Sequence, residues 1–368
     1  MDALRQSGAQ ARRTLVIQTL PGIGDMVWHM PYIKAIAESE ASKVVDILTI
    51  KRSMADQLLA SERHVSNILW LDDAIAGKGR PAAILSLAKT LRALHYDRVW
   101  ILHYSGSWAL AAFLAGIPER WGYGIGWQRL FLNRGKYLGN AGARLHPIDK
   151  AASFLQRNGL LAENVAPTIS VSAQAAAVIG QRFGACPRPW VAFGIGSTDP
   201  ARQWGVDNFS RLAAMLANRP GGTIFLVGGP AELGASEQIR NSVGAEHSAS
   251  MVSVIACPIS EVSALLKACN LYVGNDTGML NIAAAVGTPS VGLLGMGYSH
   301  RLADEGRNIY AVFPGEHAAE PGLSPMHRIS VAAVAGKVGQ LLQRHPVDAR
   351  PGVACMAATE NPHMTGEA

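Results

Sequence analysis

Short apolar runs alternate with longer amphipathic runs from one end of the chain to the other. The short runs are typical of buried strands, and the runs between them have the spacing of amphipathic helices. Such alternation indicates βαβ units, whose strands pair in parallel. The pattern therefore predicts an α/β protein with strands at residues 15–19, 45–50, 68–71, 98–103, 190–193, 223–227, 251–255, 271–273 and 290–294.

Changes in this pattern divide the chain. Segment 122–145, rich in Gly, Arg and aromatic residues, precedes a predicted helix over 146–158. A new strand-helix series begins after 161–172, so we place a domain boundary at Pro167. The last predicted helix covers 330–344, and the polar sequence beyond it has no period. The expected division is one domain over 1–167, a second over 168–345 and a mobile tail over 346–368.

Composition and charge narrow the class of protein. The chain has 368 residues, 49% of them apolar and 16% charged, which is typical of a folded protein too long for one small core. Its 33 Lys and Arg against 27 Asp and Glu give a net charge of +6. This sign favours an anionic partner such as a sugar phosphate, an acidic glycan, a nucleic acid or a membrane surface. The basic residues are scattered, so they do not single out DNA.

The cysteines and the first residues of the chain indicate the cell compartment in which the protein is expected. Neither a Cys-x-x-Cys pair nor a Cys/His cluster at metal-ligand spacing occurs, so no metal site is expected. Residues 1–13 lack the apolar core of a signal peptide, and the apolar stretch 108–117 is too short to span a bilayer. We therefore expect a cytoplasmic protein with reduced thiols at Cys186, Cys257, Cys269 and Cys355.

The most informative segment follows the apolar run 271–273. Small and turn-forming residues lead there into a predicted helix, so the backbone N–H groups of Thr277, Gly278 and Met279 are expected to point at one spot. The start of a helix favours an anion such as phosphate. The alternative is an ordinary strand-to-helix turn that Asp276 or Thr277 caps.

A second strand-to-helix turn lies near the start of the chain. Gly22 and Gly24 permit a tight turn and close approach of a ligand, and Asp25 stands where a helix begins. Asp25 is either a helix cap or a carboxylate that accepts a proton from an attacking hydroxyl. The complete dinucleotide-binding pattern is missing because Val27 occupies its third glycine position, which disfavours an NAD-dependent oxidoreductase.

Two further loops follow predicted strands of the second half. Ser197, Thr198 and Arg202 come after strand 190–193, at the sheet edge expected for Asp276. Arginine is well shaped to hold a diphosphate, although a loop arginine is more often a solvated surface residue. Glu232 follows strand 223–227, and it either accepts hydrogen bonds from sugar hydroxyls or faces water.

Taken in order, these segments resemble glycosyltransferase family 9, the heptosyltransferase-like family whose best-known members transfer heptose from ADP-heptose to the lipopolysaccharide core. The resemblance spans 15–344. Residues 274–278 look like the family's donor turn, and 22–25 look like the loop of its proposed base. Residues 202–204 resemble an element that holds the donor phosphates. Three segments resemble the region that faces the acceptor, namely 120–124, 132–134 and 146–149.

This resemblance implies a GT-B fold, with two Rossmann-like domains facing across a cleft, the acceptor on the N-terminal one and the nucleotide sugar on the C-terminal one. It also implies inverting transfer without metal or cofactor, in which Asp25 assists the acceptor hydroxyl and positive groups stabilise the leaving diphosphate. The implied donor residues are Ser197, Thr198, Arg202, Glu232, Asp276, Thr277, Gly278, Met279 and Asn281. The implied acceptor residues are Gly22, Gly24, Arg129, Arg134 and His146.

The chain departs from the family pattern at the donor site. Asn281 replaces a histidine after the donor turn, and Arg202 stands in place of the usual phosphate lysine. Cys257 and Pro258 lie where family members tend to carry glycine. An asparagine can form hydrogen bonds but cannot carry charge.

The expected function is transfer of heptose from ADP-heptose to a surface-glycan acceptor. The expected partners are a nucleotide sugar and an anionic glycan or other hydroxyl acceptor, with no nucleic acid, and a peripheral contact with the inner membrane stays open. Three alternatives also stay open: another nucleotide sugar, a protein or natural-product acceptor, and a sugar-nucleotide-binding protein without turnover.

Overall fold

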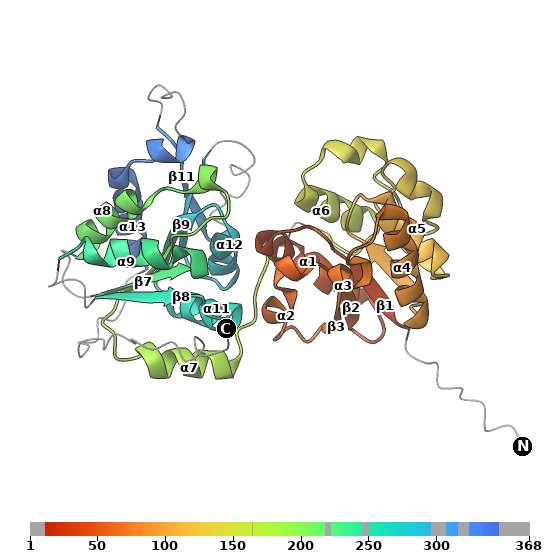
Figure 1. Ribbon diagram of the computed structural model, residues 1–368, viewed down its shortest axis with the longest axis horizontal. Coiled ribbons are helices and arrows are strands. Elements are labelled where there is room, and N and C mark those ends of the chain that lie inside the picture. Colours follow the sequence, from red (N-terminus) through yellow and green to blue (C-terminus); the bar gives the residue numbers. More distant parts are fainter. Residues whose placement is uncertain are drawn as a thin grey trace, which may run out of the picture. The chain divides into compact units, whose positions relative to one another are not determined.

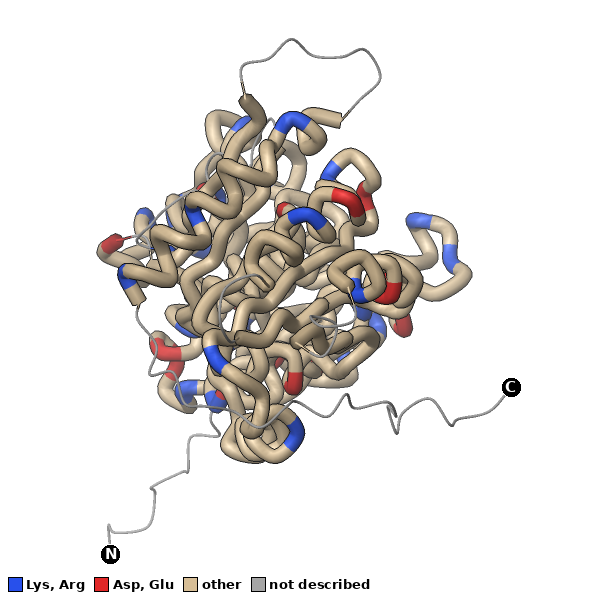
Figure 2. Tube along the Cα trace, turned by 90° about the vertical axis from the view of Figure 1, so that its left-hand side faces the viewer, with Lys and Arg blue, Asp and Glu red and all other residues tan. Residues whose placement is uncertain are grey.

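The computed structural model describes residues 12–163, 165–217, 222–244, 250–295, 307–315 and 324–345. Its contacts divide the chain into two units, Met1–Pro167 and Thr168–Ala368, which we call the N-terminal and C-terminal units. Each unit holds one parallel sheet with helices packed against it (Figure 1). Figure 2 marks the Lys and Arg positions and the Asp and Glu positions along the Cα trace. The tail predicted over 346–368 lies outside the described residues.

The sheet of the N-terminal unit has the order β3-β2-β1-β4-β5, and all its strand pairs are parallel. The strand order reverses between β1 and β4, and in open α/β sheets ligands bind beyond the carboxyl ends of the strands at such a point. The strands are β1 (Thr14–Ile17), β2 (Val45–Thr49), β3 (Val65–Trp70), β4 (Arg98–Ile101) and β5 (Glu119–Gly122).

Helices connect these strands. The longest, α1, begins directly after the turn that follows β1, and its inner face is buried. The helices are α1 (Ile23–Ser39), α2 (Ala55–Leu58), α3 (Leu71–Ile75), α4 (Arg80–Ala93), α5 (Gly106–Leu114) and α6 (Pro147–Arg157). Short 3-10 turns are η1 (Lys51–Ser53), η2 (Gly126–Phe131) and η3 (Asn140–Arg144).

The sheet of the C-terminal unit has the order β11-β10-β9-β6-β7-β8, again with parallel pairs. Here the order reverses between β6 and β9, so these two strand ends are the expected ligand-binding position. The strands are β6 (Trp190–Gly194), β7 (Thr223–Gly228), β8 (Met251–Ile255), β9 (Leu271–Asn275), β10 (Ser290–Leu293) and β11 (Ile309–Val312).

The helices of the C-terminal unit cover both faces of its sheet (Figure 1). Ser172 and Ser330 cap α7 and α13 through their side chains. The helices are α7 (Ala173–Phe183), α8 (Val206–Ala217), α9 (Leu233–Asn241), α11 (Ile259–Ala268), α12 (Gly278–Ala285) and α13 (Val331–Arg344). The 3-10 turns are η4 (Pro200–Arg202), η5 (Pro230–Glu232) and η8 (Pro325–Arg328).

The Tyr272 side chain packs over the two central strands of this sheet. Gly194 on β6 pairs with Gly274 on β9, and the buried Tyr272 side chain lies across both. A Cβ added at either glycine would overlap the tyrosine hydroxyl. The two glycines therefore make room for the ring beside the strand ends where ligands are expected.

One expectation about the thiols is wrong. Cys186 is disulfide-bonded, whereas Cys257 and Cys269 are free. Burial raises the pKa of the Cys269 thiol, which keeps that group protonated. Within the described residues, no helix is long and apolar enough to cross a membrane.

Candidate functional site

The carboxyl edge of the N-terminal sheet places Asp25 in the first turn of α1. Gly22 is the N-cap of this helix, and the Asp25 Oδ2 atom accepts a 3.0 Å hydrogen bond from the Gly22 N–H. Asp25 therefore does stabilise the helix start, although from the third helical position. A Cβ at Gly22 would lie 2.7 Å from the same oxygen, so glycine is required for this close approach. Gly24 lies beside Asp25 in the first turn.

The helix start uses only one of the two carboxylate oxygens of Asp25. Its Oδ1 atom has no hydrogen-bond partner in the part of the chain that the structure describes, and the residue is half-buried. One carboxylate can thus hold its own helix start with Oδ2 and accept a proton with Oδ1. The structural and the catalytic interpretation of Asp25 are compatible.

His29 lies one turn further along α1 and is fully buried. Its Nδ1 atom donates a 2.7 Å hydrogen bond to the Asp25 carbonyl, which fixes Nε2 as the unprotonated nitrogen of the neutral ring. Nε2 has no partner among the described residues. Burial lowers the pKa of His29 to about 4, so the ring is neutral near pH 7.

More basic side chains lie around His29. His103 follows β4, and His103 and His146 both disfavour the charged form of His29. Burial and the nearby Lys150 ammonium lower the pKa of His103 to about 4. Lys150, on α6, lies over the Tyr104 ring at 5.7 Å. Sequence reasoning missed His29, His103 and Lys150. His29 stands four residues after Asp25 and His103 ends the predicted strand 98–103, but neither position shows that these side chains come together.

The predicted acceptor residues do not all come together. His146 is the N-cap of α6, where its Nδ1 atom accepts from the Ile148 N–H at 3.4 Å, and it lies in the group around His29. Arg129 instead lies over the Tyr137 ring at 5.7 Å, and Arg134 lies beside Glu119 at β5. Within the described residues, neither arginine bonds to Asp25.

In the C-terminal unit, Asn275 joins the two strand ends at the reversal point. Its side chain is fully buried at the end of β9. The Nδ2 atom donates to the Ile195 carbonyl at 3.0 Å and to the Gly196 carbonyl at 3.3 Å, and Oδ1 accepts from the Trp204 N–H at 3.0 Å. One asparagine therefore positions the loop after β6 against the turn after β9.

Arg202 lies beside that turn. Its Nη1 atom donates to the Asp276 carbonyl at 3.3 Å and lies 3.6 Å from the Asp276 carboxylate, while Nε lies 3.5 Å from the Asp199 carboxylate. The arginine side chain is 55% exposed. Solvent-exposed ion pairs of this kind are weak, so an incoming phosphate can compete for the guanidinium.

Helix α12 begins at the same place. Thr277 is its N-cap by position, and among the described residues its side chain makes no capping bond. The N–H groups at Gly278 and Met279 are therefore open to an anion. Asn281, in the same turn, is buried, and its Oδ1 atom has no partner in the described ranges. An unpaired buried oxygen calls for a donor from a ligand or water.

The remaining predicted donor residues lie along the same edge. The Ser197 hydroxyl donates to the Asp199 carbonyl at 3.0 Å, so it orders the loop that also holds Thr198. The Glu232 Oε2 atom accepts from the Gly229 N–H at 2.8 Å. A Cβ at Gly196 would lie 2.7 Å from the Glu232 carboxyl carbon, which places Glu232 directly against the loop after β6.

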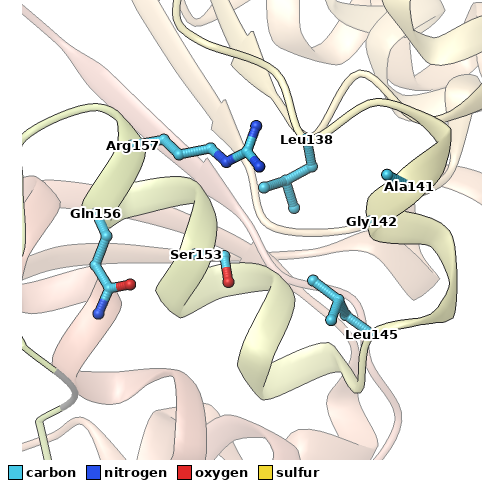
Figure 3. A pocket seen from close by; sticks show the side chains of 7 residues that line it. All are labelled: Leu138, Ala141, Gly142, Leu145, Ser153, Gln156 and Arg157. Atoms are coloured by element: carbon cyan, nitrogen blue, oxygen red, sulfur yellow. The ribbon is translucent and has the colours of Figure 1, made fainter.

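A separate hollow lies between η3 and α6 in the N-terminal unit. Its volume is about 270 Å³, and none of the predicted site residues lines it. Figure 3 shows its lining side chains, which are Leu138, Ala141, Gly142, Leu145, Ser153, Gln156 and Arg157.

The two buried histidines predict a pH dependence of stability. Their pKa values of about 4 lie below the unfolded value near 6.5, so the unfolded chain binds more protons between these limits. Stability is therefore complete above pH 6.5 and falls as the pH decreases towards 4. At about 1.4 kcal/mol per pKa unit, each histidine costs about 2.5 kcal/mol by pH 4.5.

Urea unfolding from pH 7.5 to 4.5 measures this loss. His29→Gln is expected to flatten the dependence. The exposed His95, replaced by Asn because its φ is 51°, serves as the control and should leave the slope unchanged. If the stability of His29→Gln fell with pH as steeply as that of the unchanged protein, the His29 ring would be charged in the folded state.

Comparison with known proteins agrees with this geometry. The model of glycosyltransferase family 9 (heptosyltransferase) matches residues 84–318, more than half of the chain. Lipopolysaccharide heptosyltransferase 2 of Salmonella typhimurium is 27% identical over 219 residues, covering 57% of this chain and 62% of that protein. The chain thus matches less than two thirds of that relative's length.

Two solved structures share the fold. The structure of E. coli ADP-heptose lps heptosyltransferase II has a TM-score of 0.73 at 20% identity, covering 91% of this chain and 100% of that one. E. coli heptosyltransferase WaaC with ADP-2-deoxy-2-fluoro heptose has a TM-score of 0.63 at 18% identity, covering 89% and 99%. The fold class is GT-B, with two Rossmann-like α/β units. Together with the family match, these observations establish that the chain belongs to glycosyltransferase family 9 (heptosyltransferase).

Proposed function

We propose that this protein is an inverting glycosyltransferase that moves heptose from ADP-heptose to a hydroxyl of a lipopolysaccharide-core acceptor in the cytoplasm. The observation that carries the proposal is the Arg202 guanidinium beside the start of α12, at the reversal point of the C-terminal sheet. The relative from Salmonella is a lipopolysaccharide heptosyltransferase, and one fold neighbour holds a fluorinated ADP-heptose.

The C-terminal unit is proposed to hold the donor. Its diphosphate would lie against the N–H groups at the start of α12 and accept hydrogen bonds from Arg202. When the anomeric bond breaks, negative charge grows on the departing ADP, and these donors stabilise it without a metal. The Asn281 Oδ1 atom and the Glu232 carboxylate are positioned along the same edge to accept from sugar or ribose hydroxyls.

The N-terminal unit is proposed to hold the acceptor. The Asp25 Oδ1 atom would take the proton from the acceptor hydroxyl as that oxygen attacks the anomeric carbon. The new glycosidic bond forms as the bond to the ADP phosphate breaks, and the configuration inverts. The Lys150 ammonium lies beside His103 in the same group of side chains, and positive charge there suits an anionic glycan.

A side-by-side comparison of nucleotides tests the donor. ADP, UDP, GDP and CMP are added to separate samples, and the shift of the melting temperature is measured, because a ligand that binds only the folded state raises it. ADP is expected to give the largest shift. A preference for UDP or GDP would exclude ADP-heptose as the donor, whereas a shift with ADP but no acceptor-dependent ADP release would indicate a binding protein without turnover.

Arg202→Ala is expected to weaken ADP binding. A hydrogen bond to a charged group contributes about 1.5–3 kcal/mol, which corresponds to roughly a 10- to 100-fold increase in Kd. Titration calorimetry measures the Kd, and Arg211→Ala, an exposed arginine on α8, is the matched control. Unaltered affinity in Arg202→Ala would remove this residue from the donor site.

A further inference from the structure

The N-terminal unit carries an exposed apolar patch that the proposed chemistry does not use. Phe113, Trp127 and Leu130 are 48%, 44% and 77% exposed, and we call these three side chains the aromatic patch. They form one surface, because the Phe131 ring lies 5.6 Å from that of Phe113 and 5.8 Å from that of Trp127. The patch joins the end of α5 to η2.

Buried contacts of η2 hold the aromatic patch in place. Gln128, between Trp127 and Arg129, is fully buried. Its Oε1 atom accepts from the Gly124 N–H at 2.8 Å, and its Nε2 atom donates to the His103 carbonyl at 2.7 Å. The Trp127 ring packs so closely on Gly106 that an added Cβ there would lie 2.5 Å from it. These contacts therefore hold η2 and the Trp127 ring in place.

The stretch of sequence that contains the patch is strongly basic. Residues 74–148 contain ten Lys and Arg but only two acidic residues, a net charge of +8 in a chain whose total is +6. Both acids are occupied, since Asp97 accepts from the Arg13 N–H and Glu119 pairs with Arg98. Between Arg120 and Ile148 the sequence has no acidic residue.

Basic side chains also lie at the patch itself. The Arg120 guanidinium lies 5.3 Å from the centre of the Phe113 ring, and the exposed Arg129 directly precedes Leu130. The exposed Arg134 and Lys136 follow η2 in the sequence. Exposed apolar side chains beside exposed basic ones are typical of a surface that binds anionic lipid.

We propose that the aromatic patch docks the N-terminal unit onto an anionic membrane surface. Trp127, Leu130 and Phe113 enter the boundary between headgroups and acyl chains, where tryptophan is favoured. The exposed Arg129 and Arg134 side chains bind lipid phosphates. A two-fold contact between two copies of the chain would bring the same arginines against each other, which like-charge repulsion opposes. The proposal concerns where the protein binds, and it does not depend on the sugar that it transfers.

Vesicle flotation of the full chain tests the proposal. Phosphatidylcholine vesicles are used with and without phosphatidylglycerol, at low and at high salt. The protein is expected to float with the anionic vesicles, less so at high salt, and not with neutral ones. A Trp127→Ser/Leu130→Ser double variant is expected to lose about tenfold or more in partitioning. Leu233→Ser, on α9 of the other unit and 46% exposed, is the matched control and should bind as before.

Three results would overturn the proposal: wild-type binding in the double variant, no binding of the unchanged protein to anionic vesicles, and a dimer in solution that the double variant dissociates. The melting temperature of the double variant shows whether loss of the Trp127 contact with Gly106 disturbs the fold, and Leu130→Ser alone, at a side chain that is 77% exposed, tests the patch without that contact. The ADP-induced shift of the double variant should equal that of the unchanged protein. A loss of that shift would instead concern the donor site.

Discussion

Replacing Asp25 with asparagine is expected to abolish sugar transfer while the fold and nucleotide binding remain. The asparagine oxygen can still accept from the Gly22 N–H, so the helix start keeps its 3.0 Å hydrogen bond. The amide cannot take a proton from the acceptor hydroxyl. Loss of a general base costs about 10²- to 10⁴-fold in rate. Acceptor-dependent release of ADP measures this effect.

The control must change a carboxylate in an equivalent place. Asp207 lies in the first turn of α8, so Asp207→Asn removes the same charge from a helix start away from the proposed base. The two variants should have similar melting temperatures and similar ADP affinities. Normal turnover by Asp25→Asn would rule out its assignment as the base, whatever the sugar.

Asn275→Ala is expected to destabilise the C-terminal unit and to weaken ADP binding together. The change leaves the Trp204 N–H and the Ile195 carbonyl without their buried partner. Each unsatisfied buried group costs about 1–3 kcal/mol, so we expect about 3 kcal/mol and a decrease of about 10 °C in Tm. The loop after β6 would also lose its attachment to the turn after β9.

Thermal unfolding and ADP titration measure the two effects in one sample. Asn241→Ala, at the exposed end of α9, removes the same side chain without a buried partner and should change neither quantity. If Asn275→Ala lowered the Tm but left the ADP affinity intact, the asparagine would stabilise the fold without positioning the donor loop.

The sequence predicted every interior strand of the two sheets and also the edge strands β3 and β8. Every apolar run that it singled out coincides with a strand, because parallel sheets covered on both sides demand such runs. It missed β5 and β11, each of which lies at one edge of its sheet. In β5, Glu119 pairs with Arg98 on the neighbouring strand, so the charges that stabilise the edge also conceal the apolar pattern.

The candidate site was predictable where it follows strand ends. Parallel topology brings these ends to one edge, which places Arg202 beside Asp276. What depends on side chains packing from distant segments could not be seen. The group of His29, His103 and Lys150 is of this kind. The hydrogen bonds of Asn275 to Trp204 and Ile195 could not be predicted either. The local sequence pattern does not distinguish a buried asparagine that joins two loops from one in an ordinary turn.

Tyr272 limits which substitutions related proteins can accept beside the proposed donor site. Since its hydroxyl occupies the volume that a Cβ at Gly194 or Gly274 would need, the three positions cannot change independently. A homologue with alanine at either glycine must carry a smaller residue than tyrosine at the third position. The three should therefore covary across related sequences, and a lineage can exchange this set only through paired substitutions.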